Sequence, residues 1–576
     1  MDKRANRSAW LGLGLALLSW GAAGCSGTMS RIAGPSGTPA GPPRIDRVED
    51  LGSLPLSPQG PLDLQQADGL LTPGEWIAIR GKNLLGRIDA RIGGVPARIG
   101  GYLTGDGLLV QVPRGLSVGT QELSVDNGLG RAQANVQTAS YVVAADAEAN
   151  QVAFRRLQIE VNDQGPRLGF ADAAPILNHA RARFVALAPD GGVLYVLSEP
   201  SGEAGSSSAT ADASAAIALA THCELLIVHM GAKNGPKAMG KLPLDLPGAP
   251  TAMTMGPQGV LAITTPRAVT MLATADAPLA PRVQPPVGVV TDAEPRALTA
   301  AAFLHDGKTL AVLEAYGNDV YTVDASNLQA LRAGSKTNLS GSVGEPYSID
   351  LAASPDGRSL WVLQGPNFRL AGKRLRDGLK GAWGAATSLQ WKRAGRSLGG
   401  MVAPSQGAGH SRLLRLVGAS QSLEISDEVA LPPTLLPLAI RAQGDAVYVS
   451  TLHGENPFQN IDASLAGIER LFSALRSTVQ VGQVLRVDSQ SGQAQAQVQG
   501  LAMYGDLATL PGGGLLIGTL RLGPGYLPPR LTLDWGFEIA GGRFSKHREV
   551  ANTAFGLVDA VQRLTPPYRI DRIAAQ

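Results

Sequence analysis

Four side chains with binding chemistry stand close together in one short segment of the chain. They are His453, Glu455, Asn456 and Phe458, and they follow an apolar, strand-like run that ends near Thr451. Binding residues concentrate on loops that a rigid scaffold holds in place. We therefore take this loop as the candidate binding surface.

No local pattern of catalysis or metal binding accompanies that loop. The seven histidines never show the i,i+4 spacing with glutamate of a zinc-protease helix, and the chain has no P-loop, no D-x-D-x-D-G calcium loop and no CxxC pair. The sequence thus predicts no catalytic, cofactor-binding or metal-binding residue and favours a protein that is not an enzyme. Enzymes that assemble acids and histidines from distant strands leave no local motif, so catalysis remains open.

Cys25 is the one residue with a clear covalent chemistry. Three basic residues precede the apolar run Ala9–Trp20, which is followed by Gly21-Ala22-Ala23-Gly24 and then the cysteine. This order predicts an export signal, and its apolar run is too short to span a bilayer. Ala22-Ala23-Gly24-Cys25 resembles the bacterial lipobox, although Leu is more usual at position 22. The alternative is an ordinary secretory signal cleaved near Ala23.

The lipobox resemblance implies a lipid anchor on Cys25. Residues 1–24 are then the signal peptide, and residues 25–42, rich in Gly, Pro, Ser and Thr, form a flexible tether. Lipoproteins that are retained at the inner membrane resemble one another in having Asp directly after the acylated cysteine. This chain has Ser26 at that position. We therefore expect an outer-membrane lipoprotein of the cell envelope, facing the periplasm or the surface.

The remaining composition limits the other partners. Lys and Arg number 50 against 47 Asp and Glu, without a basic block, which argues against nucleic acid. The second cysteine, Cys223, has no intramolecular partner if Cys25 is acylated, and its apolar surroundings predict a buried thiol. The 71 glycines and 39 prolines between short Val, Ile and Leu runs predict many short strands joined by tight turns.

Residues 43–145 read as an immunoglobulin-like β-sandwich. Strand candidates with a period of two alternate with turn signals at Trp76–Gly81, Arg87–Gly94, Leu108–Pro113, Gln121–Gly128 and Ala139–Ala144. The segments Pro73–Leu84 and Ile92–Ala97 resemble, in order, two conserved segments of IPT/TIG domains. The resemblance implies a spacer or a module that contacts proteins or glycans.

Residues 150–576 contain an internal repeat. Three copies share a strand, an Asp-Gly turn and a second strand, with turns at Asp190-Gly191, Asp306-Gly307 and Asp356-Gly357. Weaker copies place turn glycines at 259, 407, 444 and 512, which makes seven. Asp-Gly between apolar runs favours a hairpin, and hairpins that cannot bury their faces alone do so in a radial β-propeller.

The clear copies resemble the strand pairs of YVTN-type and lactonase-like propellers. We expect about seven blades, with six or eight as alternatives, and an all-β chain in which a sandwich precedes the propeller. Two insertions interrupt the repeat: the Ser/Ala-rich Gly202–Ala220, and Asp462–Arg476, whose apolar spacing predicts a short amphipathic helix.

The functional expectation is a membrane-anchored binding or scaffold module for protein or polysaccharide partners of the envelope. The alternative is a propeller hydrolase or lyase acting on a lactone or carbohydrate. A third possibility is an assembly component of an envelope machine that docks a partner through Asp462–Arg476.

Overall fold

A computed structural model provides the coordinates of the 576-residue chain. The residues it describes are 38–52, 69–103, 107–146, 150–162, 165–171, 176–198, 221–231, 235–275, 277–278, 280–290, 298–315, 318–339, 347–365, 411–419, 422–432, 435–453, 482–500, 503–510, 514–520 and 572–576. In these parts of the chain no helix is both long and apolar enough to cross a membrane.

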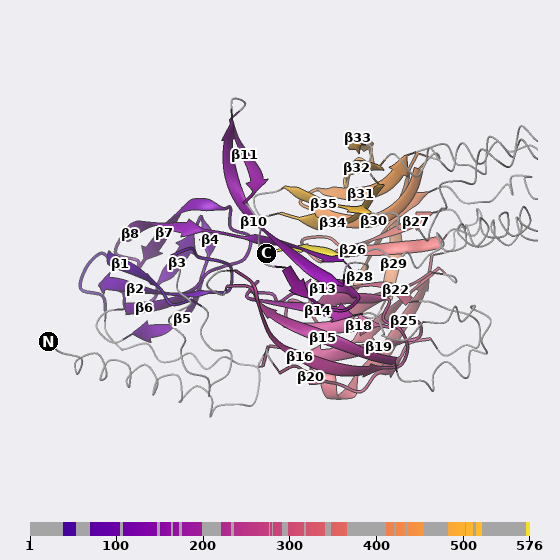
Figure 1. The fold of residues 1–576 in the computed structure, drawn as a ribbon, viewed down its shortest axis with the longest axis horizontal. Helices are drawn as coiled ribbons and strands as arrows, with labels where there is room; N and C mark the ends of the chain where they lie inside the picture. The colour runs from indigo at the N-terminus through magenta and orange to yellow at the C-terminus, as the bar shows by residue number, and fades with distance from the viewer. Residues whose placement is uncertain are drawn as a thin grey trace, which may run out of the picture.

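The N-terminal module is a β-sandwich of two four-stranded sheets (Figure 1). One sheet has the order β1-β2-β6-β5 and the other β4-β3-β7-β8. Inward-facing side chains of both sheets, such as Ile77, Ile79 and Leu123, are fully buried in one core. The strands are β1 (Arg44–Asp50), β2 (Trp76–Lys82), β3 (Asp89–Ile92), β4 (Val95–Pro96), β5 (Arg98–Leu103), β6 (Gly107–Gln111), β7 (Gly119–Asp126) and β8 (Arg131–Thr138).

One expected sandwich strand belongs elsewhere. The segment predicted at Ala139–Ala144 forms β9 (Tyr141–Asp146), which pairs with β10 (Gln151–Asn162) and with β36 (Ile573–Ala575) in a propeller sheet. The sandwich strands therefore end at Thr138, ahead of the boundary expected at residue 145. The alternating pattern of β9 suits either module, and only its distant partner strand decides between them. The IPT/TIG resemblance itself stays a prediction.

Seven blades make up the propeller in the described parts of the chain. Blades I to V run β13-β14-β15-β16, β17-β18-β19-β20 with β21, β22-β23-β24-β25, β26-β27-β28-β29 and β30-β31-β32-β33. Their bounds are β13 (Ala182–Leu187), β14 (Val193–Ser198), β15 (Thr221–His229), β16 (Lys237–Leu246), β17 (Ala252–Met255), β18 (Val260–Thr264), β19 (Ala268–Ala273), β20 (Arg282–Val283), β21 (Val287–Gly288), β22 (Leu298–Phe303), β23 (Thr309–Glu314), β24 (Asp319–Asp324), β25 (Arg332–Asn338), β26 (Tyr347–Ala353), β27 (Ser359–Gly365), β28 (Arg412–Ala419), β29 (Ser422–Ala430), β30 (Leu435–Gln443), β31 (Ala446–His453), β32 (Gly482–Asp488) and β33 (Ala494–Gly500). A 3-10 turn, η2 (Leu328–Ala330), precedes β25.

Two further sheets complete the ring. Blade VI is described by β34 (Met503–Thr509) and β35 (Leu515–Leu520). Blade VII combines β36 with β9, β10, β11 (Gly165–Phe170) and β12 (Ile176–Asn178). The innermost strands β13, β17, β22, β26, β30, β34 and β36 each contact the next, and β36 contacts β13, so the ring is closed.

The expected number of blades is confirmed, but one of the seven predicted hairpins does not start a blade. The copy at Ala403–Gly407 lies outside the described residues, between β27 and β28, which are neighbours in blade IV. The seventh blade instead comes from strands at the two ends of the propeller segment. Gly202–Ala220 and Asp462–Arg476, including the predicted helix, also lie outside the described residues.

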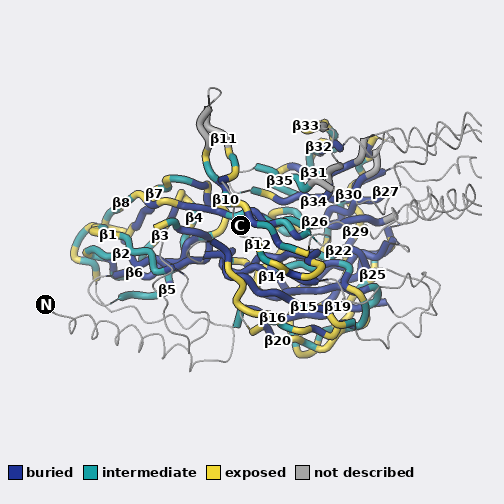
Figure 2. Tube along the Cα trace, viewed as in Figure 1, coloured by how far each residue is buried: buried dark blue, intermediate teal, exposed yellow. Residues whose placement is uncertain are grey.

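The core of the propeller lies between blades rather than at one centre. Strands such as β14 and β27 are buried along their whole length because each blade is covered on both faces by its neighbours (Figure 2). Separate apolar clusters fill the successive spaces, for example that of Tyr195 with Leu261 between blades I and II. The expected turn role of Asp190, Asp306 and Asp356 is confirmed, since each carboxylate accepts a backbone N–H two residues on.

The propeller has two unlike ends. The hairpin face carries the turns between first and second strands. The turn of blade I, at Asp190 to Gly192, meets Pro73 and Gly74 of the sandwich, which lies beyond that end of the ring (Figure 1). The opposite end, which we call the loop face, is where the second strands finish at Ser198, Gly365 and His453. The connections 199–220, 366–410 and 454–481 all start from that face.

Sandwich and propeller meet in a tightly packed joint. The side-chain amide of Gln111 donates to the Asp190 carboxylate at 3.2 Å, and the amide of Gln576 donates to the carbonyls of Pro73 and Gly191. Arg114 donates to the Ala575 carbonyl at 3.1 Å. These bonds hold the sandwich to blades I and VII.

Candidate functional site

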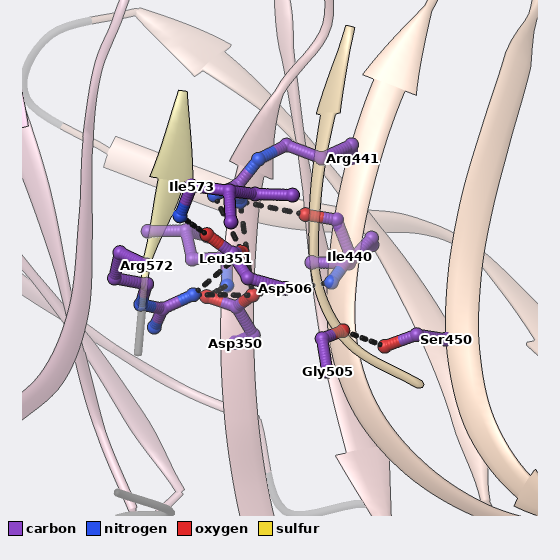
Figure 3. Close-up of polar contacts among 9 residues, drawn as sticks. All are labelled: Asp350, Leu351, Ile440, Arg441, Ser450, Gly505, Asp506, Arg572 and Ile573. Carbon is purple, nitrogen blue, oxygen red and sulfur yellow. Dashed lines mark hydrogen bonds and ion pairs between the residues drawn. The ribbon is translucent and has the colours of Figure 1, made fainter. Parts of the chain in front are cut away.

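Four charged residues from four consecutive blades meet beside the propeller axis (Figure 3). They are Asp350 on β26, Arg441 on β30, Asp506 on β34 and Arg572 immediately before β36. The Asp506 carboxylate lies 2.9 Å from the Arg441 guanidinium and 3.0 Å from that of Arg572. We call this group the axial network.

Asp506 is the centre of the axial network. Its side chain is fully buried, and its second oxygen accepts the backbone N–H of Ile573 at 3.0 Å. Burial by itself would raise the pKa of this carboxyl, but the charges of Arg441 and Arg572 and the hydrogen bonds outweigh burial, so the pKa is lowered. Asp506 is therefore an anion with both oxygens occupied.

Asp350 completes the network from the neighbouring blade. One of its oxygens accepts the backbone N–H of Leu351 at 3.0 Å, and the other accepts that of Ile440 at 3.1 Å. The second oxygen also lies 3.8 Å from each guanidinium. Two negative and two positive charges thus balance at this point of the axis.

The arrangement is better suited to holding strands together than to moving protons. A general acid or base needs a pKa near the working pH and access to the substrate, whereas Asp506 has a lowered pKa and no free oxygen. The network joins the innermost strands of blades IV to VII, including β36, which closes the ring. Its main physical effect is to fasten the closure.

Backbone irregularities place the two carboxylates at the axis. The ladder between β26 and β27 shifts register between Ser348 and Asp350, and that between β34 and β35 shifts between Tyr504 and Leu507. Such bulges turn a side chain out of the regular alternation. Neither aspartate was predicted from the sequence, although a signal exists: Asp-Leu-Ala precedes the turn proline by the same spacing at 350–355 and at 506–511.

None of the residues proposed from the sequence is a described member of this network. His453 is the last residue of β31 at the loop face, and nothing more is described of its side chain. Glu455, Asn456 and Phe458 lie outside the described residues, as do Cys25, the signal peptide and residues 25–37 of the tether. The binding loop and the lipid attachment therefore remain predictions.

Two other candidate reactive groups among the described residues are a cysteine and a G-x-S-x-G segment. The expected burial of Cys223 is confirmed, and burial raises the pKa of its thiol to about 12. Gly115-Leu116-Ser117-Val118-Gly119 has the letters of a G-x-S-x-G nucleophile elbow, but it joins strands β6 and β7 rather than a strand to a helix. Across the described ranges, His, Cys, Asp and Glu form no group that could hold a metal ion.

A buried histidine makes the stability of blade I depend on pH. Burial, with a smaller contribution from Lys237, lowers the pKa of His229 to about 4, and its Nε2 finds no hydrogen-bond partner among the described residues. The folded state then binds fewer protons than the unfolded state, so stability falls as the pH drops below 6.5. We expect a loss of about 2 kcal/mol from pH 7 to pH 5. Urea unfolding of wild type and His229→Leu at both pH values tests this, since the variant should lose less; equal losses would contradict it.

Comparison with known proteins returns similar folds only. No family model and no curated protein matches the chain. A putative 6-phosphogluconolactonase from Bacteroides fragilis is 12% identical, with a TM-score of 0.40 over 66% of this chain and 87% of that one. Pseudomonas aeruginosa periplasmic gluconolactonase gives 12% identity and a TM-score of 0.34 over 66% and 100%, and a nidogen/laminin complex gives 10% and 0.31 over 63% and 92%. Similarities this distant say nothing about what the chain binds or acts on.

Proposed function

We propose that this chain is a binding scaffold of the cell envelope, anchored to the outer membrane through a lipid on Cys25. In this proposal the sandwich is a spacer, and the loop face of the propeller receives a protein or polysaccharide partner. The observation that carries the proposal is the axial network, whose carboxylates are engaged in closing the ring rather than offered to a substrate.

The position of the N-terminal segment supports an orientation in which the loop face points away from the membrane. The carbonyls of Gly41 and Pro42 accept hydrogen bonds from Asn127 and Asn83 of the sandwich. The adjoining Arg44 pairs with Lys82 at the end of β2 remote from the joint. A chain attached here to a membrane would point the loop face away from that membrane.

Partner capture by the full chain tests the proposal. The tagged protein, purified from detergent-solubilised envelope, should retain a specific protein or glycan. The triple variant Glu455→Ala, Asn456→Ala, Phe458→Ala should lose it. A matched variant of the sandwich, Glu122→Ala, Leu129→Ala, Asn135→Ala, removes an acidic, an apolar and an amide side chain that are exposed there, and should keep it. Capture that is absent from the wild type, or unchanged in the first variant, would contradict the proposal.

A hydrolase or lyase acting on a lactone or carbohydrate is the second candidate. The observation in its favour is the convergence of Asp350 with two guanidiniums, which contact it only at 3.8 Å. To test this candidate, the purified chain is incubated with panels of lactones and oligosaccharides. Sustained turnover that Asp350→Asn abolishes in a folded protein would replace the binding proposal.

A further inference from the structure

The strand that closes the propeller is the shortest of the innermost strands in the described parts of the chain. β36 has three residues, whereas the other innermost strands have between four and nine. It pairs with β9 at Ile573, Ala574 and Ala575. So few ladder bonds leave a strand prone to local opening. β36 therefore depends on contacts at its two ends.

At the axial end, β36 is held by the axial network and by blade I. The backbone N–H of Arg572 donates to the carbonyl of Arg183 at 3.0 Å, and that of Ile573 donates to the Asp506 carboxylate at 3.0 Å. The Arg572 guanidinium also lies 3.0 Å from the same carboxylate. These bonds fix the start of β36.

At the other end, β36 is held by the sandwich. The carbonyl of Ala575 accepts a hydrogen bond from Arg114 at 3.1 Å. The Ala575 side chain is buried in an apolar cluster that joins Val118 of the sandwich to Val142 of β9 and Leu157 of β10. The closing strand is thus part of the surface on which the sandwich packs.

Gln576, the residue after β36, contacts both modules at once and is only 1% exposed. Its side-chain amide donates to the Pro73 carbonyl of the sandwich at 3.3 Å and to the Gly191 carbonyl of blade I at 2.9 Å. Its backbone carbonyl accepts the Ser140 hydroxyl at 3.1 Å, and its N–H donates to the Tyr141 carbonyl at 3.0 Å. The side-chain amide meets both of its acceptors only when the sandwich is docked.

We propose that the sandwich is a clamp on β36, so that docking of the sandwich and closure of the ring are coupled. Residues 572 and 576 are about 13 Å apart at the usual rise of a strand, and three ladder pairs lie between them. A strand this short opens as one unit, so weakening either end raises the population in which both ends are free. Such coupling acts equally in both directions. The sandwich then does more than space the propeller from its tether, and the clamp requires neither the lipid nor the loop-face partner.

Residue-resolved hydrogen exchange of the full chain at pH 7 tests the clamp. Gln111→Glu weakens the docking of the sandwich without altering β36. It sets a carboxylate against Asp190 and against the Gly74 carbonyl, to both of which the Gln111 amide donates at 3.2 Å. The amides of Arg572 and Ile573, at the axial end of β36, should then exchange at least about tenfold faster than in the wild type.

Gln576→Glu is a second variant, which sets a carboxylate against the carbonyls of Pro73 and Gly191. It should accelerate the amides of Arg572 and Ile573 by at least about the same factor. Unchanged exchange of these two amides in either variant would overturn the proposal, because the two ends of β36 would then open independently.

Two control variants separate the opening of β36 from other effects. Gln133→Glu makes the same chemical change at an exposed position of β8 and should leave the exchange unchanged. Leu310→Ala removes a fully buried side chain from blade III. It should leave the amides of Arg572 and Ile573 unchanged, because Leu310 stays packed while β36 opens. If Leu310→Ala accelerates these amides as much as Gln111→Glu does, they exchange by unfolding of the whole propeller, and the clamp does not exist.

Discussion

The Asp506→Asn protein is expected to unfold with a free energy about 3 to 5 kcal/mol below that of the wild type. The substitution leaves Arg441 and Arg572 close together, with the Asp350 carboxylate at 3.8 Å as the remaining anion within ion-pair distance among the described residues. Arg572 is held protonated by Asp506 and Asp350 against the cost of burial, so it cannot simply lose its charge. Urea unfolding at pH 7, followed by tryptophan fluorescence, measures the difference.

Asp445→Asn is the control for this prediction. Asp445 also pairs with an arginine, Arg486 at 3.4 Å, but its side chain is 68% exposed. Solvent screens such a pair, and its removal should cost less than about 1 kcal/mol. If both variants lose the same small amount, the axial network does not fasten the ring.

The Gly74→Ala protein should lose the packed joint between sandwich and propeller. Gly74 has a φ of +89°, and a Cβ built there would lie 2.5 Å from the Gly192 Cα and 2.6 Å from its nitrogen. Backbone cannot yield as a flexible side chain does, so the two modules must separate locally. We expect a loss of about 2 to 5 kcal/mol, of which about 1 to 2 is the strain of alanine at positive φ.

Gly115→Ala separates strain from contact. Gly115 has nearly the same φ, +84°, but a Cβ there would meet nothing within 4 Å. This variant should show only the conformational cost, and its small-angle scattering profile should match that of the wild type. Gly74→Ala should instead give a larger radius of gyration. Equal stability and equal size for the two variants would show that the joint tolerates the clash.

Local chemistry explains which parts of the fold the sequence could predict. An Asp-Gly pair between apolar runs specifies a hairpin within about a dozen residues, and the turns at Asp190, Asp306 and Asp356 formed as expected. The strand Trp76–Gly81 was also predictable, because its buried residues lie between clear turn signals. The sequence signals for these elements all lie within a short stretch of the chain.

Long-range partners explain what the sequence left open. Nothing in the alternation of β9 says whether it joins the sandwich or the propeller; its pairing with β36 decides that. The axial network is of the same kind, since Asp350 acquires its role only when Arg441, Asp506 and Arg572 arrive from three other blades. The repeated Asp-Leu-Ala segment marks the carboxylates, but no local pattern names their arginine partners.

The closure of blade VII has a consequence for how this protein is made. The Ser140 hydroxyl donates a hydrogen bond to the backbone carbonyl of Gln576 beside β36. These two residues are 436 positions apart in the sequence. The ring therefore cannot close before residues 572–576 emerge, and contacts this distant in sequence form slowly. A nascent chain interrupted earlier would present the uncovered edge of β9 and an unbalanced pair of aspartates. We expect such a chain to be cleaved by proteases more readily than one that contains residues 572–576.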